Sequence, residues 1–175
     1  NNIRKLDISK NKELLRLDCL SNQLDKLDVR NCTKLVTLDC SINSIKTLDV
    51  SRCKDLRILQ ANYSNITKID VKNCKKLSTL YLRSNELSEL DISNNIMLQN
   101  LDLTRNKLRT LDVTNNTSLI YIQVGENLLE ELDVSHNMKL TSLTARYNRL
   151  TSLNLPDKVR LSYPELWGEY YYQYP

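Results

Sequence analysis

The chain has 175 residues, of which 41% are hydrophobic and 26% charged, so neither a disordered nor a membrane-spanning chain is expected. The net charge of +4 is spread along the length without a block of five like charges, which argues against a nucleic-acid-binding surface. No run of 18 apolar residues is present, and two glycines are too few for a loop that cradles phosphate.

The main feature of the sequence is a repeat of 21 residues that continues to about residue 155. Each repeat holds two short strips in which every second residue is apolar, the pattern of a β-strand with one buried face. No segment keeps a 3.6-residue period for long, so we expect strands joined by turns, with at most a short helical or 3₁₀ turn. In chain order the strips lie at residues 6–8, 17–19, 27–29, 38–40, 48–50, 59–61, 69–71, 80–82, 90–92, 101–103, 111–113, 122–124, 132–134, 143–145 and 153–155.

One repeat cannot bury enough apolar surface to offset the entropy lost when its backbone is ordered. Successive repeats must therefore stack and share a core, which predicts a repeat solenoid. Adjacent strands lie about 4.8 Å apart, so residues at the same repeat position form a column along the stack.

The repeat reads L-x-x-L-x-(C/L)-x-x-N and ends in L-D-(V/I)-(S/T), which resembles the leucine-rich-repeat consensus over residues 3 to 155. The 21-residue period, the strand cysteines and the L-D-V-S tail are similar to the bacterial subclass typified by internalin J. This resemblance implies a horseshoe of the α/β class. A parallel β-sheet would line its concave side, and short extended or 3₁₀ segments its convex side. It also implies a non-catalytic binding module of a secreted or surface-attached bacterial protein.

The repeat also sets the expected domain limits. Residues 1–155 form the solenoid, with about seven repeats of which the first is incomplete, and residues 156–175 form a cap or begin a following segment. Val159, Leu161, Leu166 and Trp167 are the candidate cap residues. We expect further repeats or a cap before Asn1 in a natural monomer; alternatively, the exposed edge pairs with another chain.

Five cysteines fall into two columns, Cys19 with Cys40, and Cys32 with Cys53 and Cys74. The second column continues as Asn95, Asn116 and Asn137. Zinc requires converging ligands, whereas one side chain per coil runs parallel to the next, so buried thiol ladders are favoured over a metal site. Parallel stacking and the odd number of cysteines also argue against disulfides.

Two further columns are polar. The asparagine column is expected to turn inward and bond the backbone where the strand ends, rather than to carry glycans. It holds Asn22, Asn43, Asn85, Asn106, Asn127 and Asn148, with Ser64 in place of one asparagine.

The aspartate column runs Asp7, Asp28, Asp49, Asp70, Asp91, Asp112 and Asp133. Either it binds calcium or, as we favour, each carboxylate accepts backbone N–H bonds at a bend. In the second case Lys5, Lys26 and Lys68 would offset the charge.

Nothing in the sequence indicates catalysis. The single histidine, His136, lies in a turn, and no nucleophile, paired carboxylate or metal motif accompanies it. No cofactor is expected.

The outward columns of the concave sheet vary most between repeats, and solenoids bind ligands on such surfaces. Tyrosine and arginine are enriched there, as they are in protein interfaces. The predicted partner is a protein or peptide. As alternatives, the chain binds a glycan through exposed tyrosines, or it is a structural spacer that displays neighbouring domains. The predicted contact residues are Tyr63, Tyr81, Arg83, Asp102, Arg105, Tyr121, Gln123, Arg146 and Tyr147.

Overall fold

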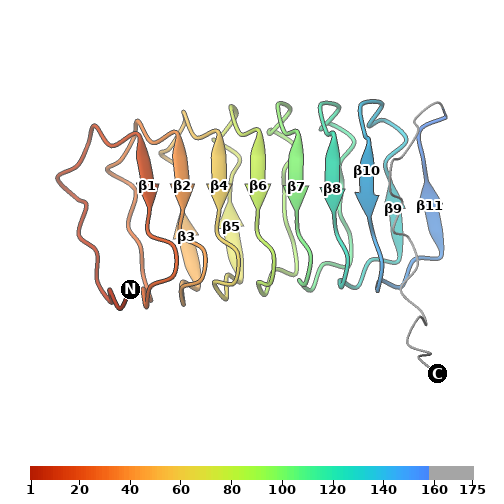
Figure 1. Cartoon of the computed structure of the whole chain (residues 1–175). Helices are drawn as coiled ribbons and strands as arrows, with labels where there is room; N and C mark the ends of the chain where they lie inside the picture. The colour runs from red at the N-terminus through yellow and green to blue at the C-terminus, as the bar shows by residue number, and fades with distance from the viewer. Residues whose placement is uncertain (158–175) are drawn as a thin grey trace, which may run out of the picture.

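The computed structural model describes residues 1–157 as a curved stack of parallel coils (Figure 1). These residues contain no helix, and so none that could cross a membrane. The candidate cap residues from Val159 to Trp167 and the tyrosines at 170–174 lie outside the described part of the chain.

The strips at 17–19, 38–40, 59–61, 80–82, 101–103, 122–124 and 143–145, the first strip of each full repeat, each overlap a three-residue strand. These seven strands pair in parallel. Their order is β1-β2-β4-β6-β7-β8-β10, and equivalent residues of successive repeats lie opposite one another. The register follows the 21-residue shift, as in Leu80 opposite Leu101. The strands are β1 (Arg16–Asp18), β2 (Thr37–Asp39), β4 (Ile58–Gln60), β6 (Thr79–Tyr81), β7 (Asn100–Asp102), β8 (Tyr121–Gln123) and β10 (Ser142–Thr144).

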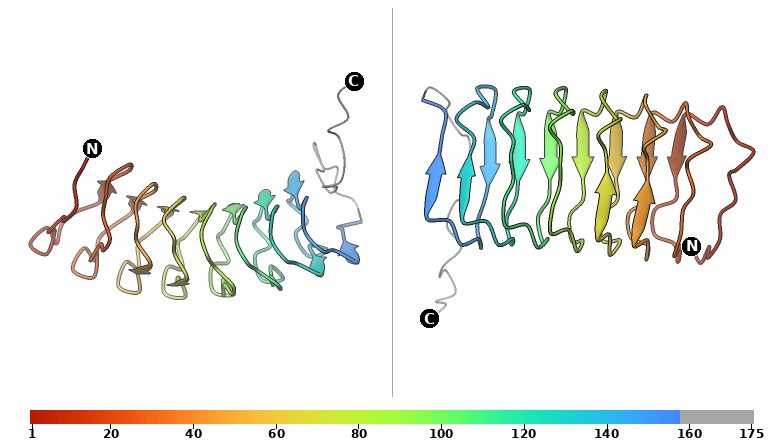
Figure 2. Two further views of the ribbon diagram at one scale, coloured as in Figure 1. Left: turned by 90° about the horizontal axis from the view of Figure 1, so that it is seen from below. Right: turned by 180° about the vertical axis from the view of Figure 1, so that it is seen from behind.

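The second strip of each repeat lies on the opposite, convex side (Figure 2). There the strips of neighbouring repeats pair as β-strands only in places. Strands β3 (Thr47–Asp49) and β5 (Lys68–Asp70) form one pair, and β9 (Glu131–Asp133) and β11 (Ser152–Asn154) form another. The stack bends toward the seven-stranded sheet, so the convex strip follows a longer arc. Continuous strand pairing at about 4.8 Å cannot be kept on both sides of such an arc.

The core lies between the two strips and consists of the inward residues of both. Leu38, Leu59, Leu80 and Leu101 of the sheet are fully buried, as are Leu24, Ile45, Ile66 and Leu87 of the segments that follow it. Consecutive turns join the convex strip to the next strand, with N–H groups bonding to carbonyls three residues earlier, as in Cys32 to Val29 and Leu35 to Cys32. The expected horseshoe is confirmed, although turns and short strands, rather than 3₁₀ segments, make up the convex side of residues 1–157.

Candidate ligand-binding face

The seven-stranded sheet lies on the concave side of the stack (Figure 2). In each strand a central inward residue lies between two outward residues, which gives two columns of outward side chains. The first residue of each strand provides column one: Arg16, Thr37, Ile58, Thr79, Asn100, Tyr121 and Ser142. The third residue provides column two: Asp18, Asp39, Gln60, Tyr81, Asp102, Gln123 and Thr144. Apart from Arg16 and Asp18, which are exposed, these side chains are half-buried against one another.

A hollow of about 460 Å³ opens in this face over β7. Tyr81 borders it from β6 and Tyr121 from β8, while Asn100 and Asp102 of β7 lie between these two strands. Ile120 and Thr141 complete the lining. The structure thus brings together three of the predicted contact residues, Tyr81, Asp102 and Tyr121, in one concavity.

The outward strand residues carry a negative net charge although the whole chain carries +4. One arginine, Arg16, stands against three aspartates, Asp18, Asp39 and Asp102, which gives −2. Each aspartate accepts an N–H bond two residues ahead, at 3.1, 3.0 and 2.9 Å respectively. Only one oxygen of each carboxylate is engaged in this way.

The second residue after each strand belongs to a third column, column three, whose side chains are less exposed than the sequence indicates. Ser41, Thr104 and Gly125 of this column are buried. Arg83 is half-buried, with its Nε atom enclosed and without a hydrogen-bond partner, and Arg146 is exposed. Column three is therefore partly a supporting layer and not a uniformly free surface.

The next residue of each repeat lies at a sharp turn and forms what we call the rim column. All seven members have left-handed backbone conformations, with φ between 53° and 59°. Left-handed φ is unfavourable for residues other than glycine or asparagine, and most of all for a β-branched residue such as Ile42. The rim column consists of Ser21, Ile42, Tyr63, Ser84, Arg105, Glu126 and Tyr147.

The turn is held by the inward side chain that follows each rim residue, an asparagine in every repeat except at Ser64. Asn106, for example, donates to the Leu82 and Leu103 carbonyls at 2.9 and 3.0 Å and accepts the Leu87 N–H at 3.0 Å. Asn43, Asn85, Asn127 and Asn148 make equivalent bonds. The predicted inward role of the asparagine column is confirmed.

Two contacts involve the last three residues of the rim column, Arg105, Glu126 and Tyr147. Arg105 and Glu126 form an ion pair at 2.7 Å, and the pKa of Arg105 is raised first by this hydrogen bond and then by the charge of Glu126. The Arg146 guanidinium lies 5.8 Å from the centre of the Tyr147 ring, within cation–π range. Tyr63 and Tyr147 stay 47% and 53% exposed, so the rim presents large aromatic surfaces to solvent.

The five cysteines form the two predicted ladders and are all free thiols. Cys74 donates to the Val50 carbonyl at 3.5 Å, and in the next coil the amide of Asn95 donates to the equivalent Val71 carbonyl at 3.0 Å. Asparagine and cysteine thus perform the same structural task at this position. Burial raises the pKa of Cys19 and Cys53 to about 11 and that of Cys74 to about 12, which keeps these thiols protonated and unreactive near neutral pH.

Each convex aspartate accepts the N–H of the residue two positions ahead, as Asp91 does from Ser93 at 3.0 Å. This confirms the predicted role of the aspartate column, and the same bond recurs at Asp7, Asp28, Asp49, Asp70, Asp112 and Asp133. The lysines expected to offset the charge, Lys5, Lys26 and Lys68, form no direct ion pair with this column among the described residues. In residues 1–157 the ion pairs to this column come from Arg30 with Asp28 and Lys72 with Asp91.

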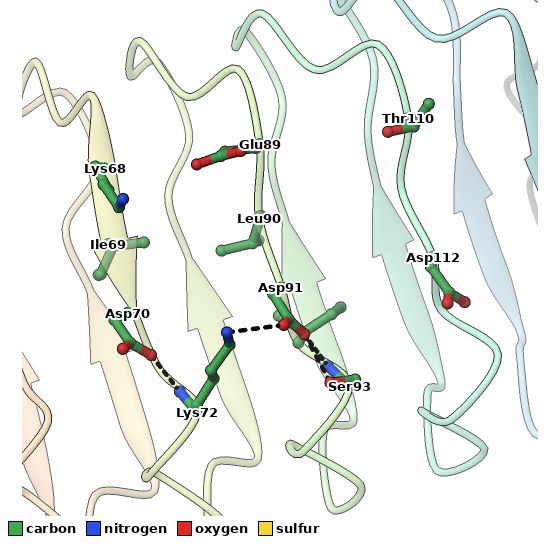
Figure 3. A pocket seen from close by; sticks show the side chains of 11 residues that line it. Lys68, Ile69, Asp70, Lys72, Glu89, Leu90, Asp91, Ser93, Thr110 and Asp112 are labelled. Carbon is green, nitrogen blue, oxygen red and sulfur yellow. Dashed lines mark hydrogen bonds and ion pairs between the residues drawn. The ribbon is translucent and has the colours of Figure 1, made fainter.

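The convex side also contains grooves, which open where the second strip is unpaired. One of them, of about 670 Å³, lies between β5 and the segments that contain Leu90 and Thr110 (Figure 3). Lys72 reaches across it to Asp91 at 3.2 Å. Its polar lining includes three of the repeating aspartates, Asp70, Asp91 and Asp112, and the hydrogen bonds of these aspartates hold the bends. Similar grooves recur along the convex side.

His136, the only histidine, lies on an exposed turn, where its Nδ1 is 3.2 Å from the Ser135 hydroxyl. The sequence did not indicate this contact. Asp133 bonds to the Ser135 N–H instead of orienting the histidine, so the three residues are not arranged as a nucleophile, a base and an orienting acid.

No protein-family profile matches the chain, and no curated protein matches it significantly. Among solved structures, the functional domain of InlJ from Listeria monocytogenes, which includes a cysteine ladder, is 30% identical with a TM-score of 0.58 over 89% of this chain. This chain spans 47% of that one.

Two further structures share the fold at 20% identity. Internalin C2 of Listeria monocytogenes has a TM-score of 0.73 over 82% of this chain and 66% of its own. The LRR ectodomain of an Arabidopsis thaliana membrane receptor kinase, in complex with CASPARIAN STRIP INTEGRITY FACTOR 2, has a TM-score of 0.66 over 81% of this chain and 21% of its own. The chain therefore has the leucine-rich-repeat solenoid fold and is similar in fold to the internalins.

Proposed function

We propose that this chain is a non-catalytic binding module that recognises a protein or peptide on its concave face, as part of an exported or surface-attached bacterial protein. The observation that carries the proposal is the hollow over β7, where Tyr81 and Tyr121 flank the polar groups of Asn100 and Asp102. Aromatic side chains with a few polar groups between them are typical of peptide-binding surfaces.

The strained rim column supports the same proposal. A left-handed residue other than glycine costs about 1–2 kcal/mol, yet this column contains no glycine and includes Ile42, Tyr63 and Tyr147. Unfavourable conformations are retained where the side chain has a use that offsets the cost. Tyr63 and Tyr147 are the large exposed side chains that a ligand on the concave face would meet at its edge.

The test uses a phage-displayed library of random peptides, selected against the immobilised chain. Enriched peptides are measured by fluorescence polarisation on the wild type and on Tyr81→Ala/Tyr121→Ala. Loss of both tyrosines removes aromatic contact area without touching the core, so affinity should fall at least tenfold while the circular dichroism spectrum and melting temperature stay unchanged.

The matched control is Thr47→Ala/Lys68→Ala, which changes two outward side chains of the convex strands β3 and β5. It should leave affinity unchanged. Enriched peptides that bind the double tyrosine variant as tightly as the wild type would overturn the concave site, and no enrichment at all would favour a structural spacer. A glycan array probed with the wild type and the double tyrosine variant separates glycan recognition from peptide recognition.

A further inference from the structure

We infer that the hollow over β7 is a subsite for a positively charged side chain, a lysine or arginine of the bound peptide. This inference rests on the proposed function and adds the chemical class of the ligand. The juxtaposition that carries it is a half-buried carboxylate, Asp102, placed between the aromatic rings of Tyr81 and Tyr121.

The Asp102 carboxylate can accept further hydrogen bonds. Its Oδ1 accepts the Thr104 N–H at 2.9 Å, and in residues 1–157 no ion pair involves Asp102. A half-buried carboxylate without a cation gains from a partner that can replace the water it has lost.

The flanking rings suit the same partner. In the sheet register Tyr81 lies directly opposite Asp102, and Tyr121 lies directly opposite Asn100. The strands that carry the two tyrosines are separated by two strand spacings, or about 9.6 Å. The two tyrosines therefore border a group bound above β7 from both sides, and an ammonium or guanidinium within about 6 Å of a ring face is attracted by the ring's quadrupole.

The surrounding charge is also complementary. Column two carries Asp18, Asp39 and Asp102 and no basic residue, and the two neighbours of Asp102 in this column, Tyr81 and Gln123, are uncharged. The nearest basic groups belong to the outer columns. Arg105 is paired with Glu126, and Arg83, which follows Tyr81 on the same coil, forms no ion pair among the described residues. Arg83 is a positive charge that would repel the proposed ligand group.

The test uses the peptides selected on the wild-type chain, each resynthesised with one basic residue at a time made neutral, lysine as norleucine and arginine as citrulline. Binding is measured on the wild type, on Asp102→Asn and on Asp39→Asn. Asparagine can still accept the backbone N–H two residues ahead, so both variants keep the local turn. Asp39 lies in the same column outside the hollow and has the same backbone bond, which makes it a matched control.

We expect one basic residue whose neutralisation weakens binding to the wild type about tenfold, as for a hydrogen bond between charged groups. The same neutralisation should have no effect on Asp102→Asn, because the two changes remove one interaction, and should keep its full effect on Asp39→Asn. Peptides that require Tyr81 and Tyr121 but contain no basic residue coupled to Asp102 would overturn the subsite and leave the binding function standing. Peptides that ignore the two tyrosines would overturn both.

Discussion

Replacing Ser64 with asparagine should stabilise the chain, because it restores a hydrogen bond that six of its equivalents make. At this repeat position an asparagine Oδ1 accepts a backbone N–H 19 residues earlier, as Asn43 does from Leu24 at 2.9 Å and Asn85 does from Ile66 at 2.8 Å. Ser64 uses its hydroxyl to donate to the Cys40 and Asn62 carbonyls at 3.3 and 3.1 Å. The N–H of Ile45, a fully buried residue, then has no hydrogen-bond partner within the described part of the chain.

The magnitude follows from the cost of that unpaired donor. A buried N–H without a partner costs about 1–3 kcal/mol, and the asparagine loses part of this gain in side-chain entropy on being fixed, about 1 kcal/mol or less. We expect a net gain of about 1–2 kcal/mol in the free energy of unfolding, from these two terms. For a domain of this size that corresponds to a rise in melting temperature of about 2–8 °C.

The gain is measured by urea denaturation followed by circular dichroism, with hydrogen exchange of the Ile45 amide as a local readout. The matched control is the reverse change, Asn106→Ser, which leaves the Leu87 N–H unpaired and should destabilise the chain by a similar amount. If Asn106→Ser destabilises as expected while Ser64→Asn has no effect and Ile45 exchanges no more slowly, the amide bond is not the source of stability at this position and the reasoning is refuted.

Three other changes test the rim, the thiols and the aspartates. Ile42→Asn should raise stability by about 1 kcal/mol in urea, because a β-branched residue at φ 54° gives way to one that tolerates this region, whereas Ile42→Val should not. The thiols should resist Ellman's reagent at pH 8 until urea is added. Since folding raises their pKa from 9.0 to about 11 for Cys53 and about 12 for Cys74, the unfolded thiols ionise first, and stability should fall as pH rises above about 9; Cys53→Asn should weaken this fall. Folding lowers the pKa of Asp91 from 3.8 to about 2, so its contribution is present above about pH 4 and lost toward pH 2. Asp91→Ala should remove this acid sensitivity and destabilise the bend more than Asp91→Asn does. An acid titration followed by fluorescence checks this, and a dependence of stability on pH with the same slope as in the wild type would contradict it.

The periodicity of the sequence was sufficient to predict the solenoid, its columns and several of their roles. A shift of 21 residues advances the chain by one strand spacing, so similarity along the sequence becomes adjacency in space. This is why the cysteine ladder could be continued as Asn95, Asn116 and Asn137, and why one bond pattern for asparagine and one for aspartate applied to almost every repeat.

Features that depend on how unlike neighbours meet could not be predicted in this way. The left-handed turn at Ile42 and Tyr63 contradicts the local preference of those residues, because the bonds of the following inward side chain determine the backbone there. The ion pair between Lys72 and Asp91 joins neighbouring coils across a groove on the convex side, and the repeat alone did not indicate it. The hollow over β7 arises where side chains from three successive coils differ in size, so only the stacked structure reveals it. A repeat determines where equivalent residues lie, whereas tertiary packing determines what the variable side chains between them enclose.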